Sequence, residues 1–447
     1  MCDCSNNGNN NNNNNTDQFC GSWTPKAPMI TPRELFAATS GPDKTGTSPT
    51  DVDSDPRVYV IGGNGPQGEP LQSCEKYNPN DDTWVEISPL PEPVGNCNGS
   101  FVPDYGKSKN EVLGYIYVMG DNKARLYRYN IKQDLWDVFP VPFSVSNASL
   151  QYLDDIGGPL SELLQAITGT SFPPCSDGKT LWIVGGNGTE TETWYINLAT
   201  NGTIDGDWIR GPDLPLKRVN PVVGRTFWRD TGITSYGVSN CATILVCGGY
   251  RPDGSIDDQI QLLTRYECNW QWIIPTDNPT NFPNTALKLA YPVADGAFGT
   301  EQWPETLVTG GRPLVFGGNP DLLNGGSVQY SQLRFTRGRY RPYPKNDKYW
   351  NLTTSMPGQR TNFRAPPLSQ ENSSVFGGRR VSRFLCIGGR NPYGLVTDKT
   401  QLFELPTPSP FLICSAPNNQ KCNCSKHRTK EKRSKHRHER KHRCDNI

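Results

Sequence analysis

The chain has 447 residues, a formal net charge of +1 and a hydrophobic content of 34%. Its 44 glycines and 39 prolines suit many short strands and turns better than long helices. No run of 18 apolar residues occurs, so the sequence predicts no membrane-spanning helix. The 14 cysteines are too sparse for this length to indicate a dense disulfide framework.

Residues 1–19 form a polar leader that contains an unbroken run of asparagines from Asn9 to Asn15. Such a tract buries too little apolar surface to offset the entropy of ordering it, so we expect disorder. The leader also lacks the basic and apolar segments of a signal peptide. We therefore expect an intracellular, cytoplasmic protein.

A repeated pattern begins in residues 57–63, where an apolar strand ends in two glycines. Tyr77 and Trp84 follow this strand, seven residues apart. Related units recur, and their last glycines stand at positions 63, 120, 186, 249, 318 and 389. Each interval is long enough for a four-stranded sheet and its loops. The sequence therefore predicts six copies of one supersecondary unit.

The two ends of the chain indicate how the six units close into a ring. The sixth unit has Phe403 but no tryptophan after it, whereas Trp23 belongs to no complete unit. We expect the strand around Trp23 to complete the unit formed by residues 360–405. Such closure removes the exposed sheet edges that invite aggregation.

An apolar strand followed by Gly-Gly, Tyr and Trp resembles the kelch repeat. The resemblance implies an all-β fold, a six-bladed kelch-type β-propeller over residues 20–405 that is closed by an N-terminal strand. Residues 1–19 would be a disordered leader, and residues 406–447 a linker and a disordered basic tail. We expect the ring to be monomeric.

Two details within the ring are less regular. Residues 156–167 place leucines and an isoleucine at helical spacing, which predicts a short surface helix between the second and third units. In the fifth unit, Tyr330 and Phe335 are alternative candidates for the repeated tyrosine. Cys247 and Cys386 lie within apolar strands and are expected to act as small buried hydrophobes.

Two sets of polar positions are expected at one mouth of the propeller, because adjacent strands of a blade are antiparallel. One set directly follows the glycines: Asn64, Asp121, Asn187, Tyr250, Asn319 and Arg390. The other begins the first strand of a blade: Arg33, Arg218 and Arg360, with Asn96, Asn147, Asn220 and Asn362 in the position two residues further on. The arginine position holds Val94 and Val145 in two blades and cannot be aligned after Trp272.

In kelch propellers that bind peptides, these two sets supply the contacts, often as arginines that grip acidic side chains. The resemblance thus implies a scaffold that binds a protein or peptide partner, an acidic one where the arginines take part. The alternative is that the polar residues satisfy turn backbones or line a hydrated axis.

The sequence offers little for catalysis. Some kelch-like propellers are copper radical oxidases, whose copper requires two histidines, but the predicted ring has none. The four histidines all lie in the tail: His427, His436, His438 and His442. We find no P-loop, zinc-protease or dinucleotide motif and expect no enzyme, cofactor or metal in the ring. An enzyme that uses carboxylates in the mouth stays open.

The tail carries most of the charge asymmetry. Residues 421–447 contain 11 Lys/Arg and 3 Asp/Glu, whereas the remainder carries 34 against 41. One interpretation is a non-specific arm for nucleic acid or another anionic surface. Others are a nuclear-import signal or a solvated tail. Terminal cysteines and histidines could also bind zinc, although their Cys-x-Cys spacing is unusual for that metal.

Overall fold

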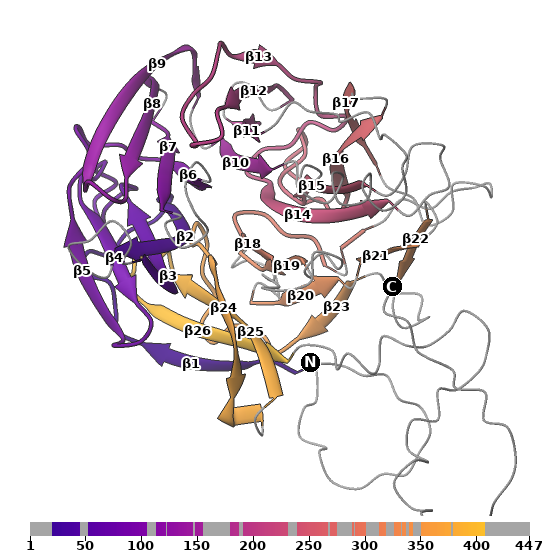
Figure 1. The fold of residues 1–447 in the computed structure, drawn as a ribbon. Helices are drawn as coiled ribbons and strands as arrows, with labels where there is room; N and C mark the ends of the chain where they lie inside the picture. The colour runs from indigo at the N-terminus through magenta and orange to yellow at the C-terminus, as the bar shows by residue number, and fades with distance from the viewer. Residues whose placement is uncertain are drawn as a thin grey trace, which may run out of the picture.

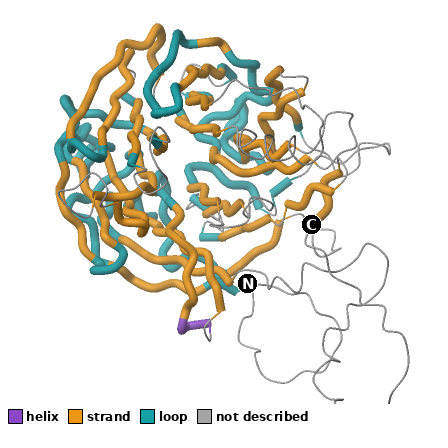
Figure 2. Tube along the Cα trace, viewed as in Figure 1, coloured by secondary structure: helices purple, strands orange, loops and turns teal. Residues whose placement is uncertain are grey.

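The computed structural model shows six four-stranded antiparallel sheets arranged around one axis (Figure 1). It describes residues 20–44, 52–104, 113–121, 123–145, 148–154, 179–186, 191–230, 239–266, 269–274, 288–289, 291–300, 313–318, 326–331, 333–336, 339–342, 350–376 and 379–406. Strands dominate this part of the chain, where the one helix is the 3-10 turn η1(Ser374–Phe376) (Figure 2). The predicted all-β six-bladed propeller is confirmed.

The first three blades follow chain order. Blade 1 contains β2(Ala37–Lys44), β3(Val52–Ile61), β4(Cys74–Asn78) and β5(Thr83–Ile87). Blade 2 contains β6(Asn98–Pro103), β7(Gly114–Met119), β8(Lys123–Asn130) and β9(Leu135–Val145). Blade 3 contains β10(Ser149–Asp154), β11(Lys179–Val184), β12(Thr193–Leu198) and β13(Ile209–Arg210). The first strand of each blade lies nearest the axis and the last lies outermost (Figure 1).

The second half of the ring departs from this order twice. Blade 4 contains β14(Val222–Asp230), β15(Ser239–Cys247), β16(Ile260–Tyr266) and β17(Asn269–Ile273). Blade 5 contains β18(Ala297–Thr300), β19(Pro313–Phe316), β20(Val328–Ser331) and β23(Trp350–Thr353), with the hairpin β21(Leu333–Thr336)–β22(Arg339–Pro342) inserted. Blade 6 contains β24(Pro367–Ser373), β25(Arg379–Ile387), β26(Thr400–Pro406) and β1(Ser22–Lys26). Of the two aromatic candidates in blade 5, Tyr330 is the one that lies in the blade.

The glycine pair is required at the end of the second strand. Gly62 and Gly63 have φ values of 56° and 95°, a region that L-residues with side chains rarely adopt. A Cβ atom on Gly63 would also lie 2.5 Å from the Cβ atom of Phe36. The pair therefore lets the chain turn while the second strand packs closely against the first.

In blades 1 and 2 the repeated tyrosine and tryptophan join the blade to the segment that precedes it. In blade 1, Tyr77 Oη donates to Asp82 Oδ1 over 2.6 Å, and the same oxygen accepts from Ala27 N over 2.9 Å. Trp84 Nε1 then donates to Ala27 O over 2.9 Å. Blade 2 repeats these bonds with Tyr129, Asp134, Ser88 and Trp136. The aspartate, at positive φ in both blades, is thus part of the repeat.

The N-terminal strand closes the ring as predicted. β1 pairs antiparallel with β26, and Trp23 lies opposite Phe403 with ring centroids 4.7 Å apart. Trp23 Nε1 donates to Thr354 O over 3.2 Å, which joins this strand to blade 5. Blade 6 is therefore built from both ends of the ring.

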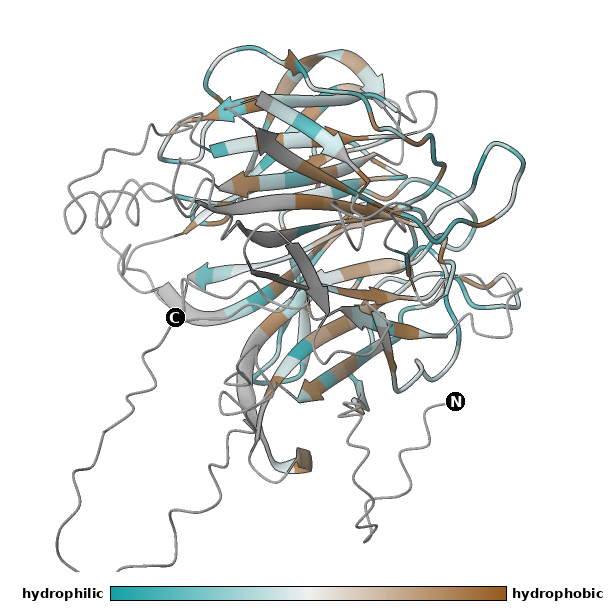
Figure 3. Cartoon of the chain, turned by 90° about the vertical axis from the view of Figure 1, so that its right-hand side faces the viewer, coloured by the Kyte–Doolittle hydropathy of each residue, from teal (hydrophilic) through white to brown (hydrophobic). Residues whose placement is uncertain are grey.

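The core lies between the blades, where side chains of neighbouring sheets meet. Figure 3 shows brown apolar segments alternating with paler and teal ones along the strands, whereas the loops are mostly teal or pale. Cys247 and Cys386 are buried as predicted, and burial raises the pKa of Cys386 to about 12. The predicted helix at residues 156–167 lies outside the described residues. No helix in the described part of the chain is long and apolar enough to cross a membrane.

Candidate functional site

Arg33 is buried inside blade 1. Its side chain is fully buried, and Nη1 donates to Gly62 O and Ser73 O over 2.8 and 2.9 Å. Nη2 forms an ion pair with Glu75 Oε1 at 2.5 Å, and that carboxylate also accepts from the amides of residues 30 and 31. The guanidinium therefore holds the turn after β3 against the start of β4.

Arg360 repeats this arrangement in blade 6 with a neutral partner. Nη1 donates to Gly388 O over 3.1 Å and to Lys399 O over 2.9 Å. Nη2 donates to Gln401 Oε1 over 2.6 Å. Burial lowers the pKa of the Arg360 guanidinium, yet no carboxylate is needed to hold it in place.

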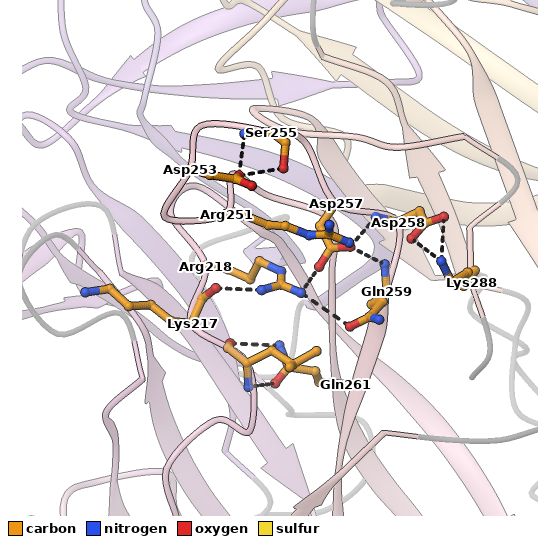
Figure 4. Close-up of polar contacts among 11 residues, drawn as sticks. Lys217, Arg218, Arg251, Asp253, Ser255, Asp257, Asp258, Gln259, Gln261 and Lys288 are labelled. Carbon is orange, nitrogen blue, oxygen red and sulfur yellow. Dashed lines mark hydrogen bonds and ion pairs between the residues drawn. The ribbon is translucent and has the colours of Figure 1, made fainter. Parts of the chain in front are cut away.

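Arg218 occupies the same position in blade 4 within a larger charged cluster (Figure 4). It pairs with Asp257, which is fully buried and also accepts from Arg251 over 2.7 Å. Burial, reinforced by the nearby charge of Arg251, lowers the pKa of Arg218. Lys288 pairs with Asp258 at the edge of the cluster, 3.1 Å away.

These three arginines differ from the expectation that they project into the mouth. The guanidinium groups of Arg33 and Arg360 donate to carbonyls of the glycine turn, whereas that of Arg218 pairs with the buried Asp257. Their burial favours a structural role. The structure also supplies the alignment that was missing in blade 5. The carbonyls of Arg33, Val94 and Val293 each accept from the second glycine of the preceding blade, so Val293 takes the arginine position.

The residue after the glycine pair reaches from one blade to the next. Asn64 Nδ2 donates to Asn96 Oδ1 of blade 2 over 3.1 Å. Tyr250 Oη donates to Asp295 Oδ2 of blade 5 over 2.7 Å. In blade 6 the same position holds Arg390. Its Nε lies 3.0 Å from a carboxylate oxygen of Glu34 in blade 1. These polar side chains thus bridge the seams between blades around the mouth.

A second set of residues, here called the second ring, surrounds the axis, and its members all have positive φ. Its members in the described blades are Leu35, Asn96, Asn220, Asp295 and Asn362, with φ between 43° and 57°. Their backbones are linked head to tail. Asp295 N donates to Asn220 O, Asn362 N to Asp295 O, Leu35 N to Asn362 O and Cys97 N to Leu35 O, over 2.8–3.4 Å. Asparagine and aspartate tolerate this conformation better than other residues with side chains, which explains their recurrence.

The structure describes only some of the remaining predicted positions. Asp121 also has positive φ, at 56°, and is partly exposed. Asn147, Asn187 and Asn319 lie outside the described residues. Of the predicted positions after the glycines, the structure describes Asn64, Asp121, Tyr250 and Arg390, each of which follows the second strand of its blade.

Two carboxylates at the mouth were not singled out from the sequence. Burial raises the pKa of Asp295, and the hydrogen bonds from Tyr250 and Asn220 partly oppose this effect, while the charge of Glu34 adds to it. Glu34 accepts from Arg390 and from Asn362 Nδ2, the latter over 3.1 Å. Asp295 stands two residues after the arginine position of its blade, where other blades have an asparagine. An alignment of this blade would therefore have indicated Asp295 from the sequence.

Glu92 anchors a charged cluster at the edge of blade 2. It accepts from Lys123 Nζ over 3.0 Å, from Tyr127 Oη over 2.8 Å and from Arg125. The bonds from Tyr127 and Lys123 are the main reason why the pKa of Glu92 falls to about 2. A lowered carboxyl pKa stabilises the fold above the unfolded value of about 4.3, and this contribution is lost as pH falls toward 2.

We therefore predict that Glu92→Gln lowers the free energy of unfolding by about 1 kcal/mol at pH 7, as for partly exposed ion pairs. The difference from the unchanged protein should shrink between pH 4 and pH 2. Urea denaturation at pH 7, 4 and 3 measures it. A difference that stays constant over this range would contradict the assignment.

Comparison with known proteins places one motif within blade 1. Residues 54–91 match the family model of the Kelch motif. An F-box/kelch-repeat protein of Arabidopsis thaliana is 35% identical over 83 residues, which cover 18% of this chain and 17% of that protein. The chain therefore matches about a sixth of the length of this relative.

Two solved structures are similar in outline only. The structure of YjhT has a TM-score of 0.41 at 14% identity and is matched over 84% of this chain and 95% of its own. A fungal alcohol oxidase in complex with copper has a TM-score of 0.42 at 12% identity, over 87% and 76% of the two chains. Both likenesses are too remote to bear on function. This chain is therefore similar to kelch-repeat proteins in its first blade, and its six four-stranded sheets form a β-propeller.

Proposed function

We propose that this propeller is a non-catalytic scaffold that binds a protein or peptide partner at its mouth, inside the cell. The observation that carries the proposal is the set of polar side chains that the blade turns hold in fixed positions around one end of the axis. A preorganised polar surface loses little entropy when a partner binds. The kelch motif and the kelch-repeat relative are compatible with such a role.

The structure also changes which groups we propose as contacts. Arg33, Arg218 and Arg360 are engaged within their blades, whereas Asn64, Asp121 and Tyr250 keep part of their surface exposed at the mouth. Arg390 is the arginine of the predicted set that is most exposed, with 36% of its side chain accessible. An acidic group on the partner would therefore meet Arg390 rather than the buried arginines.

The test begins with capture of partners from extract of the source cells and their identification by mass spectrometry. Each identified partner is then purified, and its affinity is measured for three forms of the chain. These are the intact protein, the triple variant Asn64→Ala, Asp121→Ala, Tyr250→Phe, and a truncation after residue 406. We expect the triple variant to bind at least tenfold more weakly and the truncation to bind within twofold, with circular dichroism verifying the fold of each.

A different result would favour one of the other interpretations. Affinity that survives the triple change but disappears with the tail would make residues 421–447 the binding element, with nucleic acid or another polyanion as its target. Its affinity should then fall steeply as salt rises.

The raised pKa of Asp295 favours a second candidate, an enzyme that uses carboxylates at the mouth. Within the described residues, no group of three or more His, Cys, Asp or Glu is placed to hold a metal. Asp295 and Glu34 are the carboxylates that we propose for such an enzyme. A hydrolytic activity of the purified chain that disappears in Asp295→Asn would support this candidate against the scaffold.

A further inference from the structure

Three loops at the mouth share one backbone conformation. They join the second and third strands of blades 1, 4 and 6, at residues 64–70, 250–256 and 390–396. In each loop the second residue donates its amide to the carbonyl of the sixth: Gly65 to Glu69, Arg251 to Ser255 and Asn391 to Leu395, over 2.8–2.9 Å. The fifth residue is a glycine at nearly the same φ: Gly68 at 80°, Gly254 at 81° and Gly394 at 79°. The three loops therefore offer one scaffold for different side chains.

The side chains at the tips of these loops differ in character. Blade 1 presents Gln67 and Glu69, and blade 4 presents Asp253 and Ser255 (Figure 4). Blade 6 instead presents Tyr393 and Leu395, which are 88% and 64% exposed. The same backbone forms with polar residues in the other two blades, so the fold does not require an aromatic and an aliphatic side chain here. Water contact leaves their apolar surface without the stabilisation that burial would give.

The blade 6 loop is also held rigidly by its own polar groups. Asn391 Oδ1 accepts from the amides of Tyr393 and Leu395 over 2.9 and 3.0 Å. Arg390 Nη1 donates to Gly394 O over 2.6 Å while its Nε is held by Glu34. The backbone that carries the two apolar side chains is therefore held in place before any partner arrives, which lowers the entropy cost of ordering the loop on binding.

We propose that Tyr393 and Leu395, here named the blade 6 finger, insert into an apolar pocket of a folded protein partner. The proposal rests on the scaffold function above and names the part of the mouth that supplies most of the affinity. A projecting tyrosine offers a large, rigid contact, and tyrosine is enriched among the residues that dominate binding energy. Arg390 at the base of the finger is paired with Glu34 but keeps 36% of its side chain exposed, so an acidic group at the rim of the pocket can approach it.

The experiment places a photoreactive phenylalanine analogue at position 393, or at position 67 as the matched control, and irradiates each protein in source-cell extract. The protein that crosslinks to position 393 is identified, purified and measured by isothermal titration calorimetry. We expect the variant Tyr393→Gln, Leu395→Ser to bind it about 30-fold more weakly. The sister-loop control Gln67→Ser, Glu69→Ser should bind within twofold, and both variants should keep the circular dichroism of the intact chain.

The experiment tests the finger proposal separately from the proposed scaffold function. If the partner binds the finger variant within twofold but loses affinity for the Asn64, Asp121, Tyr250 triple variant, the finger proposal is overturned and the scaffold function stands. If neither position crosslinks to a protein and no partner binds the mouth, both proposals fail together. Equal losses in the finger variant and in the sister-loop control would also overturn the finger, because the effect would not be specific to blade 6.

Discussion

Replacing Arg33 by alanine is expected to lower the free energy of unfolding by about 3–5 kcal/mol, the usual cost of breaking a buried ion pair. The change leaves the carboxylate of Glu75 buried without its counter-ion and removes the donors that serve Gly62 O and Ser73 O. Both losses concern the turn that joins β3 to β4. Equilibrium urea denaturation followed by tryptophan fluorescence measures the effect.

The chain itself supplies the matched controls. Gln261, Gln329 and Gln401 stand where blade 1 has Glu75, since each pairs with the corresponding residue of its second strand. Blade 5 combines such a glutamine with Val293 in the arginine position. We therefore expect the double variant Arg33→Val, Glu75→Gln to be more stable than Arg33→Ala alone. An Arg33→Ala protein within 1 kcal/mol of the unchanged chain would show that the ion pair does not hold the blade.

The ring was predictable because its signals repeat. Six copies of an apolar strand and glycines set the number of blades, and the unmatched Trp23 showed where the ends meet. The direction of the arginines was not predictable in the same way. Whether Arg33 faces the mouth or the interior depends on the carbonyls of the glycine turn, and these have no signature in the sequence.

The same limit applies to the polar positions after the glycines. Asn64, Tyr250 and Arg390 each follow the second strand of their blades, as their recurrence in the sequence indicates. Their hydrogen bonds, however, run to Asn96, Asp295 and other groups on the next blade. In blades 1, 4 and 6 these recurring polar residues therefore serve, at least in part, the joints between blades. Recognition of one partner is better supplied by a feature that differs between blades.

Removal of residues 1–26 is expected to open the ring. The deletion takes away β1, so β26 loses its outer partner and Phe403 loses the ring of Trp23. It also removes the bond from Trp23 Nε1 to Thr354 O that ties blade 6 to blade 5. Truncating a fully buried tryptophan costs about 3–5 kcal/mol, so the half-buried Trp23 should contribute less than this range. The exposed edge of β26 favours association between chains. Thermal denaturation and size-exclusion chromatography measure the two effects.

The point variant Trp23→Ala separates packing from strand pairing, because it keeps the backbone bonds of β1. It should lose less stability than the deletion, whereas Thr24→Ala, on an exposed position of the same strand, should change little. A synthetic peptide of residues 20–29 added to the truncated chain should restore its melting temperature by pairing with β26. A truncated chain that stays monomeric and melts as the intact protein does would contradict this account. Such a result would mean that β1 is not needed to close or stabilise the ring.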